Sequence, residues 1–167
     1  GMEFKQGDIF DTLITCENGE TISIRLDTTL PRFYSREFTV RGTAGMYEAN
    51  TNTVFFDGEP EIFETEKQLA MSLNNADRFY FKYLPQYWQN ITREEIDQGH
   101  GGMDVFCFRS FFDCLKKDLP MPVDVYDAAA WMSITPLTEQ SIKTGGFVEI
   151  PDFTKGAYKT RERYDIK

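Results

Sequence analysis

The pair Asn18–Gly19 constrains the fold more than any other local feature, because it lies between two runs of residues typical of β-strands. The runs cover residues 9–16 and 21–27, and an Asn-Gly pair between such runs is typical of a tight β-hairpin. Three apolar residues of the second run share one face of its predicted strand: Ile22, Ile24 and Leu26. The chain is therefore expected to begin with an antiparallel pair of strands.

Three further strand signals follow, at residues 37–41, 46–48 and 53–57. Short segments rich in turn-forming residues separate them, at positions 42–45 and 50–52. Tight turns between successive strands favour antiparallel pairing. The first third of the chain thus predicts about five short strands in an antiparallel sheet.

Helical patterns fill most of the remaining sequence. They begin near Thr65 and continue into an aromatic segment, residues 79–88, in which Pro85 should end or bend any helix. A firmer helix is predicted from residue 102 to residue 117, with apolar residues on two faces. A helix of this kind should lie between a sheet and another helix.

The last predicted helix starts at Asp124, which suits an N-cap, and runs towards Lys143 with a kink at Pro136. Residues 147–150 are expected to form a short edge strand after the helix has ended at the preceding glycines. A polar, irregular tail at residues 154–167 completes the sequence.

Strands first and helices afterwards predict an α+β fold, an open, mostly antiparallel β-sheet with helices packed on one face. Residues 2–153 are assigned to a single domain, which the tail follows. Gly1 ahead of Met2 is typical of the remnant that stays when a purification tag is removed.

The net charge of −9, from 27 acidic and 18 basic residues, argues against binding to nucleic acid or to anionic membranes. No apolar run reaches the ~18 residues of a membrane-spanning helix, so no membrane partner is expected. No secretory signal is recognised, and the compartment stays open between periplasm and cytoplasm. Cys107 and Cys114 are predicted to be buried thiols, and the single histidine argues against a metal site.

A cluster of glycines surrounds that histidine at residues 99–104. Glycines let the backbone bend sharply and approach a ligand, and His100 would lie beside the free backbone donors of a helix start. The competing interpretation is structural, with His100 forming a hydrogen bond to Asp104 in the first turn of the helix. The residues alone favour this structural interpretation.

The loop at residues 30–36 is the second candidate, since Arg32 and Arg36 flank Tyr34. Such donor-rich loops can bind a sugar or a carboxylate, although the arginines could equally pair with surface acids. The aromatic segment 79–88 could stack on a sugar ring, but such runs more often fill a core. No dinucleotide-binding, Walker or nucleophile-elbow motif is present, so no catalytic residue is assigned.

Five motifs occur in a characteristic order: LPRFYSR (30–36), GTAG (42–45), HGGMD (100–104), DVYDAAAW (124–131) and ITPL (134–137). Together they resemble the C-terminal domain of the Gfo/Idh/MocA oxidoreductases. Within that group they look most like glycoside hydrolase family 109, the NAD-dependent α-N-acetylgalactosaminidases. The resemblance extends from about Gly7 to Phe153.

The resemblance implies a dihydrodipicolinate-reductase-like domain that binds a small carbohydrate and, in the full-length enzyme, follows a Rossmann domain holding NAD. That Rossmann domain is absent from this chain, so the chain alone is expected to bind no cofactor and to be inactive. The implied reaction is redox-neutral: NAD takes a hydride from the sugar, the aglycone is eliminated, water adds and the hydride returns. A homodimer through the free face of the sheet is also expected.

Within the family pattern, Tyr34 corresponds to a tyrosine that contacts the sugar. Arg32, His100 and Asp104 match family motifs and are further candidate substrate-binding residues, whereas Phe33 stands where the family often has proline. Two other functions stay open. The chain could be a standalone, non-catalytic domain that binds a carbohydrate or a protein, or a domain of an ordinary sugar or inositol dehydrogenase.

Overall fold

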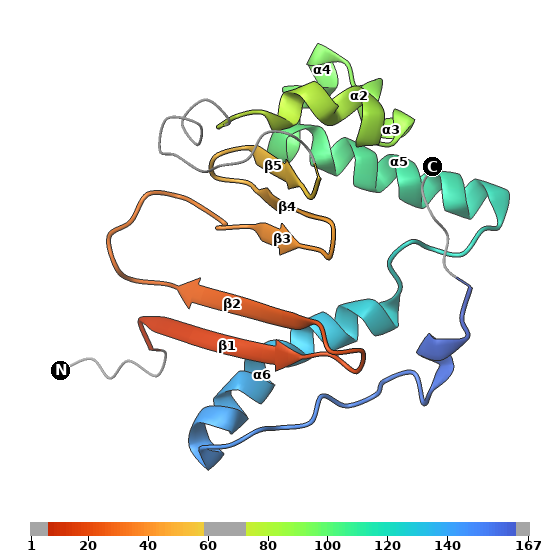
Figure 1. Cartoon of the computed structure of the whole chain (residues 1–167). Coiled ribbons are helices and arrows are strands. Elements are labelled where there is room, and N and C mark those ends of the chain that lie inside the picture. The colour runs from red at the N-terminus through yellow and green to blue at the C-terminus, as the bar shows by residue number, and fades with distance from the viewer. Residues whose placement is uncertain (1–6, 59–72, 163–167) are drawn as a thin grey trace. The chain divides into compact units, whose positions relative to one another are not determined.

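The computed structural model describes residues 7–58 and 73–162 (Figure 1). In these residues five strands precede a series of helices, which confirms the predicted α+β class. The strands are β1 (Ile9–Thr15), β2 (Thr21–Asp27), β3 (Thr39–Arg41), β4 (Gly45–Glu48) and β5 (Thr53–Phe56). The helices are η1 (Ala76–Phe79), α2 (Tyr80–Tyr83), α3 (Gln86–Gln89), α4 (Arg93–Ile96), η2 (Gly99–Gly102), α5 (Met103–Lys117), α6 (Val125–Thr144) and η3 (Ala157–Lys159). The helical start predicted near Thr65 lies outside the described residues.

The described residues belong to two compact units. The first unit comprises residues 7–35 and 132–150, and it holds the β1–β2 hairpin and the second half of α6. The second unit comprises the remaining described residues, with strands β3 to β5, helices η1 to α5, the start of α6 and η3. None of the helices in these stretches has the length and apolar character that crossing a bilayer requires.

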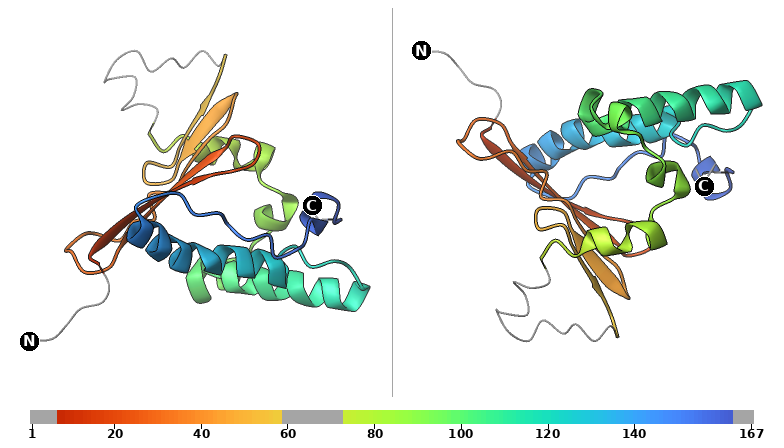
Figure 2. Two further views of the ribbon diagram at one scale, coloured as in Figure 1. Left: turned by 90° about the horizontal axis from the view of Figure 1, so that it is seen from below. Right: turned by 90° about the horizontal axis from the view of Figure 1, so that it is seen from above.

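The β1–β2 hairpin confirms the prediction made from Asn18–Gly19. The strands pair antiparallel from Ile9 opposite Asp27 to Thr15 opposite Thr21. Gly19 has a φ of 97°, the left-handed conformation that glycine adopts without strain. The second half of α6 lies along one side of this hairpin (Figure 2), where the hydroxyls of Thr12 and Thr138 are 2.9 Å apart.

The strands form two sheets rather than one, because β1 pairs only with β2 while β3, β4 and β5 form a separate antiparallel sheet. Residues 28–38, which connect the two sheets, include no strand. Pro31 has no backbone N–H to donate to a ladder, and the carbonyls of Phe33 and Ser35 are occupied by the side chain of Arg32.

A buried asparagine joins the second sheet to the helices of its unit. Asn75 donates from its side-chain amide to the carbonyl of Val54 at 2.9 Å and accepts from the Val54 N–H at 2.7 Å. This pair of hydrogen bonds satisfies both backbone groups of Val54 in the way that another strand would. Next to it, the ring of Phe56 packs at 5.1 Å from Phe79 and 5.2 Å from Tyr83.

Helix α5 spans the predicted range, but only one of its two apolar faces is covered. Phe106 and Cys114 are buried, and the indole of Trp88 lies 4.3 Å from the Phe106 ring. Phe108 is 62% exposed and Cys107 is also exposed. The predictions of a sandwiched helix and of a buried Cys107 are therefore wrong, because no second layer covers that face in the described residues.

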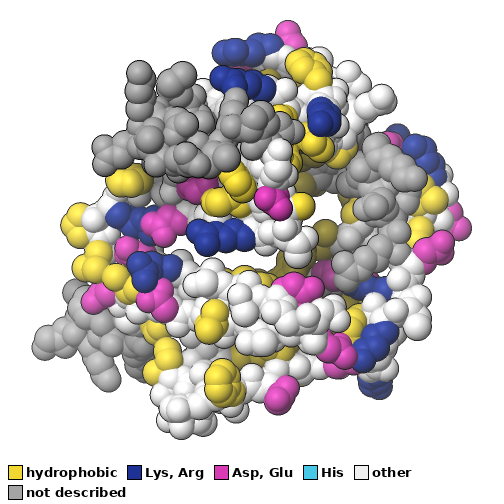
Figure 3. Space-filling model, viewed as in Figure 1, with side chains coloured by type: hydrophobic (Ala, Val, Ile, Leu, Met, Phe, Trp, Pro, Cys, Tyr) yellow, Lys and Arg dark blue, Asp and Glu magenta, His cyan; other side chains and the backbone are white. Residues whose placement is uncertain are grey.

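Asp124 caps α6 as predicted: its Oδ1 accepts from the backbone N–H groups of Tyr126 at 2.8 Å and Asp127 at 3.0 Å. The helix ends before Gly145, which has a φ of 68°. The edge strand predicted at residues 147–150 is wrong, since this segment pairs with no strand among the described residues and Phe147 is fully exposed. On the visible surface, acidic and basic side chains lie interspersed with apolar ones (Figure 3).

Candidate functional site

The four predicted site residues belong to different units, two residues to each. Arg32 and Tyr34 belong to the loop that follows β2 in the first unit, whereas His100 and Asp104 lie at the start of α5 in the second unit. Each pair has a defined local geometry of its own.

Arg32 directs its guanidinium at the loop on which it lies. Its Nη2 donates to the carbonyl of Ser35 at 2.9 Å, and its Nε donates to the carbonyl of Phe33 at 3.3 Å. A carboxylate oxygen of Asp27, at the end of β2, lies 3.9 Å away. These contacts support the interpretation in which the arginine pairs with protein groups.

Two aromatic side chains project from the same loop. Phe33 is 82% exposed and Tyr34 is 84% exposed. Leaving this much aromatic surface in water forgoes the stabilisation that burial of such large rings normally gives. Neighbouring exposed rings on one loop are therefore suited to binding a partner with an apolar face, and a sugar ring presents such a face through its C–H groups.

At the start of α5, the His100 Nδ1 lies 3.1 Å and 3.0 Å from the two carboxylate oxygens of Asp104. This geometry matches the structural interpretation of the histidine. His100 itself has a φ of 55°, in the left-handed region that costs a non-glycine residue energy and that recurs at functional sites. A proton on Nδ1, held by Asp104, leaves Nε2 of the largely exposed ring as an acceptor.

Two of the glycines near His100, Gly99 and Gly102, lie close to neighbouring atoms. A Cβ on Gly99 would lie 2.3 Å from the Oδ2 of Asp104, and a Cβ on Gly102 would lie 2.8 Å from the carbonyl oxygen of Glu95. This turn does not fit the pyrophosphate of a dinucleotide, because the Asp104 carboxylate already occupies the first turn of the helix and would repel phosphate. The described residues also contain no group of three or more His, Cys, Asp or Glu placed to hold a metal ion.

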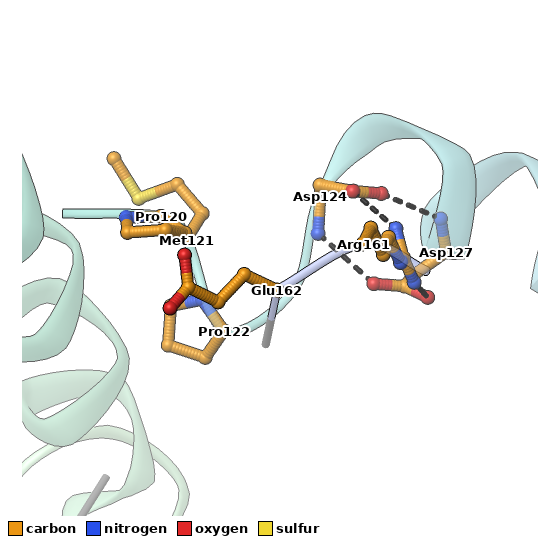
Figure 4. A pocket seen from close by; sticks show the side chains of 7 residues that line it. All are labelled: Pro120, Met121, Pro122, Asp124, Asp127, Arg161 and Glu162. Carbon is orange, nitrogen blue, oxygen red and sulfur yellow. Dashed lines mark hydrogen bonds and ion pairs between the residues drawn. The ribbon is translucent and has the colours of Figure 1, made fainter. Parts of the chain in front are cut away.

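A third polar cluster was missed by the sequence reasoning. Arg161 forms ion pairs with Asp124 and Asp127 in the first turn of α6. These residues line a cavity of about 280 Å³ together with Pro120, Met121, Pro122 and Glu162 (Figure 4). The backbone N–H of Asp127 and the Arg161 guanidinium hold the pKa of the Asp124 carboxyl below its usual range.

The signal for this cluster was present in the sequence, since two carboxylates three residues apart at a helix start attract a cation. Arg161 could not be identified as that cation because it lies in the segment predicted to be an irregular tail. The cluster links the described end of that segment to the start of α6 within the second unit.

The family described as "Glycosyl hydrolase 109, C-terminal domain" matches residues 1–160. A glycosyl hydrolase family 109 protein of Stenotrophomonas maltophilia is 40% identical over 96% of this chain and 34% of its own length. An alpha-N-acetylgalactosaminidase of Tannerella forsythia is 36% identical over 96% of the chain and 33% of its own length.

The chain thus spans about a third of the length of these relatives. A further relative, from Shewanella woodyi, has the same proportions, with 36% identity over 95% of the chain and 35% of that protein. A family match over nearly the whole sequence, together with relatives at this identity, establishes the assignment suggested by the five motifs. The chain belongs to the glycosyl hydrolase 109 C-terminal domain family.

Proposed function

We propose that this chain is the substrate-binding C-terminal part of an NAD-dependent glycosidase that acts on α-N-acetylgalactosaminides. The observation that carries the proposal is the exposed pair Phe33 and Tyr34 on a loop fixed by Arg32, in a domain of the glycosyl hydrolase 109 family. The name of the Tannerella forsythia relative supports this choice of sugar.

In this proposal the loop after β2 meets the sugar. The ring of Tyr34 or Phe33 stacks on the C–H face of the pyranose, which contributes dispersion and removes apolar surface from water. The phenolic hydroxyl of Tyr34 can donate to a sugar oxygen and accept from a sugar hydroxyl. Tyr34 thus supplies an apolar contact and hydrogen bonds that orient the sugar, and specific binding of a polar ring requires both.

Within the second unit, His100 is proposed as a candidate polar contact to substrate. Asp104 orients the imidazole through Nδ1, so that Nε2 is available to accept a hydrogen bond or a proton from a hydroxyl group. Asp104 would act through the histidine and would not itself touch the sugar. Removal of Asp104 should then alter the orientation of the His100 ring.

The proposed dependence on NAD belongs to the full-length protein. A bound nicotinamide would supply hydride transfer to and from the sugar, which is chemistry that protein side chains do not provide. Because the glycine-rich turn before α5 does not fit a dinucleotide, no step of that chemistry is assigned to residues of this chain.

The homodimer expected from the family resemblance is part of the proposal. Within the first unit, the side of the hairpin opposite Thr12 carries Ile9 and Leu13, of which Leu13 is 67% exposed. Pairing of this face with a second copy would remove apolar surface from water. The molar mass of the full-length protein in solution, measured by light scattering during gel filtration, tests this part of the proposal.

The function itself is tested by comparing this chain with the full-length protein for NAD binding and for hydrolysis of 4-nitrophenyl α-N-acetylgalactosaminide. The proposal expects both activities in the full-length protein and neither in this chain. Hydrolysis by this chain alone would contradict the proposal that catalysis requires the full-length protein. Net reduction of NAD with an oxidised sugar as product would instead favour an ordinary dehydrogenase, and sugar binding without turnover would favour a non-catalytic domain.

A further inference from the structure

The loop that carries the two exposed aromatic residues is tied to the hairpin at its base. The backbone N–H of Thr28 donates to the carbonyl of Asp8 at 3.0 Å, and the Thr28 hydroxyl donates to the carbonyl of Gly7 at 3.2 Å. The Thr29 hydroxyl bonds to the carboxylate of Asp8. Hydrogen bonds to the start of β1 therefore determine the direction in which the loop leaves β2.

Beyond this base, Arg32 spans the segment that presents the rings. Its two hydrogen bonds reach the carbonyls of Phe33 and Ser35, one on each side of Tyr34. A guanidinium is planar and its donors have a fixed geometry, so two such bonds restrain the backbone between the two carbonyls. That backbone includes the dihedral angles that set the direction of the Tyr34 side chain.

The Arg32 guanidinium also interacts with a carboxylate at the end of β2. Asp27 is the last residue of β2, its side chain is 11% exposed, and its Oδ2 lies 3.9 Å from the Arg32 Nη1. A largely buried carboxylate favours a nearby cation, and here it directs the arginine towards the protein and away from solvent. The Arg32 side chain is less than one third exposed, in contrast to the two aromatic rings beside it.

From these contacts we propose that Arg32 is a positioning residue, which fixes Tyr34 for the sugar and does not bind the sugar itself. The inference rests on the proposed function, in which Tyr34 contacts substrate. A restrained loop has already lost the conformational freedom that binding would otherwise remove, so substrate binds to a prepared surface. Displacement of a contact by about 1 Å can reduce the rate roughly 100-fold.

The test is a double-mutant cycle in the full-length protein, with 4-nitrophenyl α-N-acetylgalactosaminide as the probe. Arg32→Ala should lower kcat/KM by roughly 10- to 100-fold in the wild-type background. In the Tyr34→Ala background the same change should have little further effect, because the residue through which Arg32 acts has been removed. An equal loss in both backgrounds would show that Arg32 contacts the substrate directly, and would overturn the inference.

Arg32→Lys separates hydrogen-bond geometry from charge. Lysine keeps a cation near Asp27 but lacks the planar fork that reaches two carbonyls, so it should not restore activity. Full activity in Arg32→Lys would overturn the inference. This variant also carries the test if Arg32→Ala fails to fold, which the melting temperature and circular dichroism of each variant report.

Arg25→Ala is the matched control, because it removes another arginine–aspartate pair on the same hairpin, in which Arg25 Nε lies 2.7 Å from Asp11. It should leave kcat/KM unchanged. If Tyr34→Ala retains full activity, the proposed function fails and the inference fails with it. If Tyr34→Ala is impaired and Arg32→Ala is not, the proposed function stands and only the inference is overturned.

Discussion

The turn before α5 contains two neighbouring glycines that differ in one respect, which makes them a matched pair for a stability experiment. Gly101 has a φ of 68° and Gly102 has a φ of 88°, so both are in the left-handed region. A Cβ on Gly101 would meet open space. A Cβ on Gly102 would lie 2.8 Å from both the Glu95 carbonyl oxygen and the Ile91 Cδ1, whereas ordinary contact begins at 3.4 Å.

The expected changes in unfolding free energy follow from these two environments. A left-handed conformation costs an alanine about 1–2 kcal/mol, and this cost applies to both substitutions. Loss of glycine flexibility in the unfolded chain also affects both variants alike, by about 0.4–1 kcal/mol in the stabilising direction. Only Gly102→Ala adds the steric cost of overpacking, about 1–3 kcal/mol. The difference in unfolding free energy between the variants should therefore be about 1–3 kcal/mol.

Urea unfolding of the two variants, followed by circular dichroism, measures this difference. Thermal unfolding gives a second reading, in which each kcal/mol corresponds to about 2–4 °C for a protein of this size. Gly101→Ala should be the more stable variant by both methods. Equal stability, or a more stable Gly102→Ala, would refute the argument that close packing against Glu95 and Ile91 explains the glycine at position 102.

Two further predictions concern the second unit. Phe106→Ala should lower the unfolding free energy by about 3–5 kcal/mol, because it leaves a cavity beside Trp88. Phe108→Ala removes an exposed side chain and should lower it by less than about 1 kcal/mol. Urea unfolding distinguishes the two variants, and similar losses would contradict the packing described for α5. The lowered pKa of the Asp124 carboxyl means that its stabilising contribution is present above the ordinary value of about 4 and is lost as the pH falls through the lower folded value. Melting temperatures measured from pH 7 down to about 2.5 should thus fall less steeply below about pH 4 in Asp124→Asn, and an unchanged slope would argue against this assignment.

Local chemistry made several elements predictable from the sequence. Gly19 made the turn of the hairpin predictable, because its φ of 97° is one that few other residues adopt without strain. Asp124 was identifiable as a cap because its side chain is of the right length to bond the first turn of a helix. The contact between His100 and Asp104 was one of the two interpretations of the glycine cluster, and it forms across a left-handed turn that precedes the helix.

Features that depend on contacts distant in sequence were not predictable in this way. The apolar pattern of α5 gave two candidate faces, and only packing showed that Phe108 stays exposed. The segment 147–150 has strand-like residues, but a strand also needs a partner, which the sequence does not specify. Arg161 pairs with Asp124 across 37 residues, and no local pattern indicates such a contact.

The loop after β2 shows a different limit of prediction from sequence, which concerns the role of Arg32. The sequence indicated correctly that Arg32 and Tyr34 lie together on a loop, and it offered two opposite interpretations of the arginine. The structure directs the Arg32 donors to the carbonyls of Phe33 and Ser35 while both neighbouring rings stay exposed. Residue type alone does not distinguish a donor that binds a ligand from one that binds its own loop.

We propose above that this domain supplies the sugar-contacting surface of a glycosidase, with Tyr34 at its centre. The most direct test is the rate of 4-nitrophenyl α-N-acetylgalactosaminide hydrolysis by the full-length protein and by its Tyr34→Ala variant, with the melting temperature of each measured in parallel. The wild type should hydrolyse this substrate, and the variant should lose at least about tenfold in kcat/KM at unchanged stability. Full activity in a folded Tyr34→Ala variant, or no hydrolysis by the wild type, would contradict this proposal.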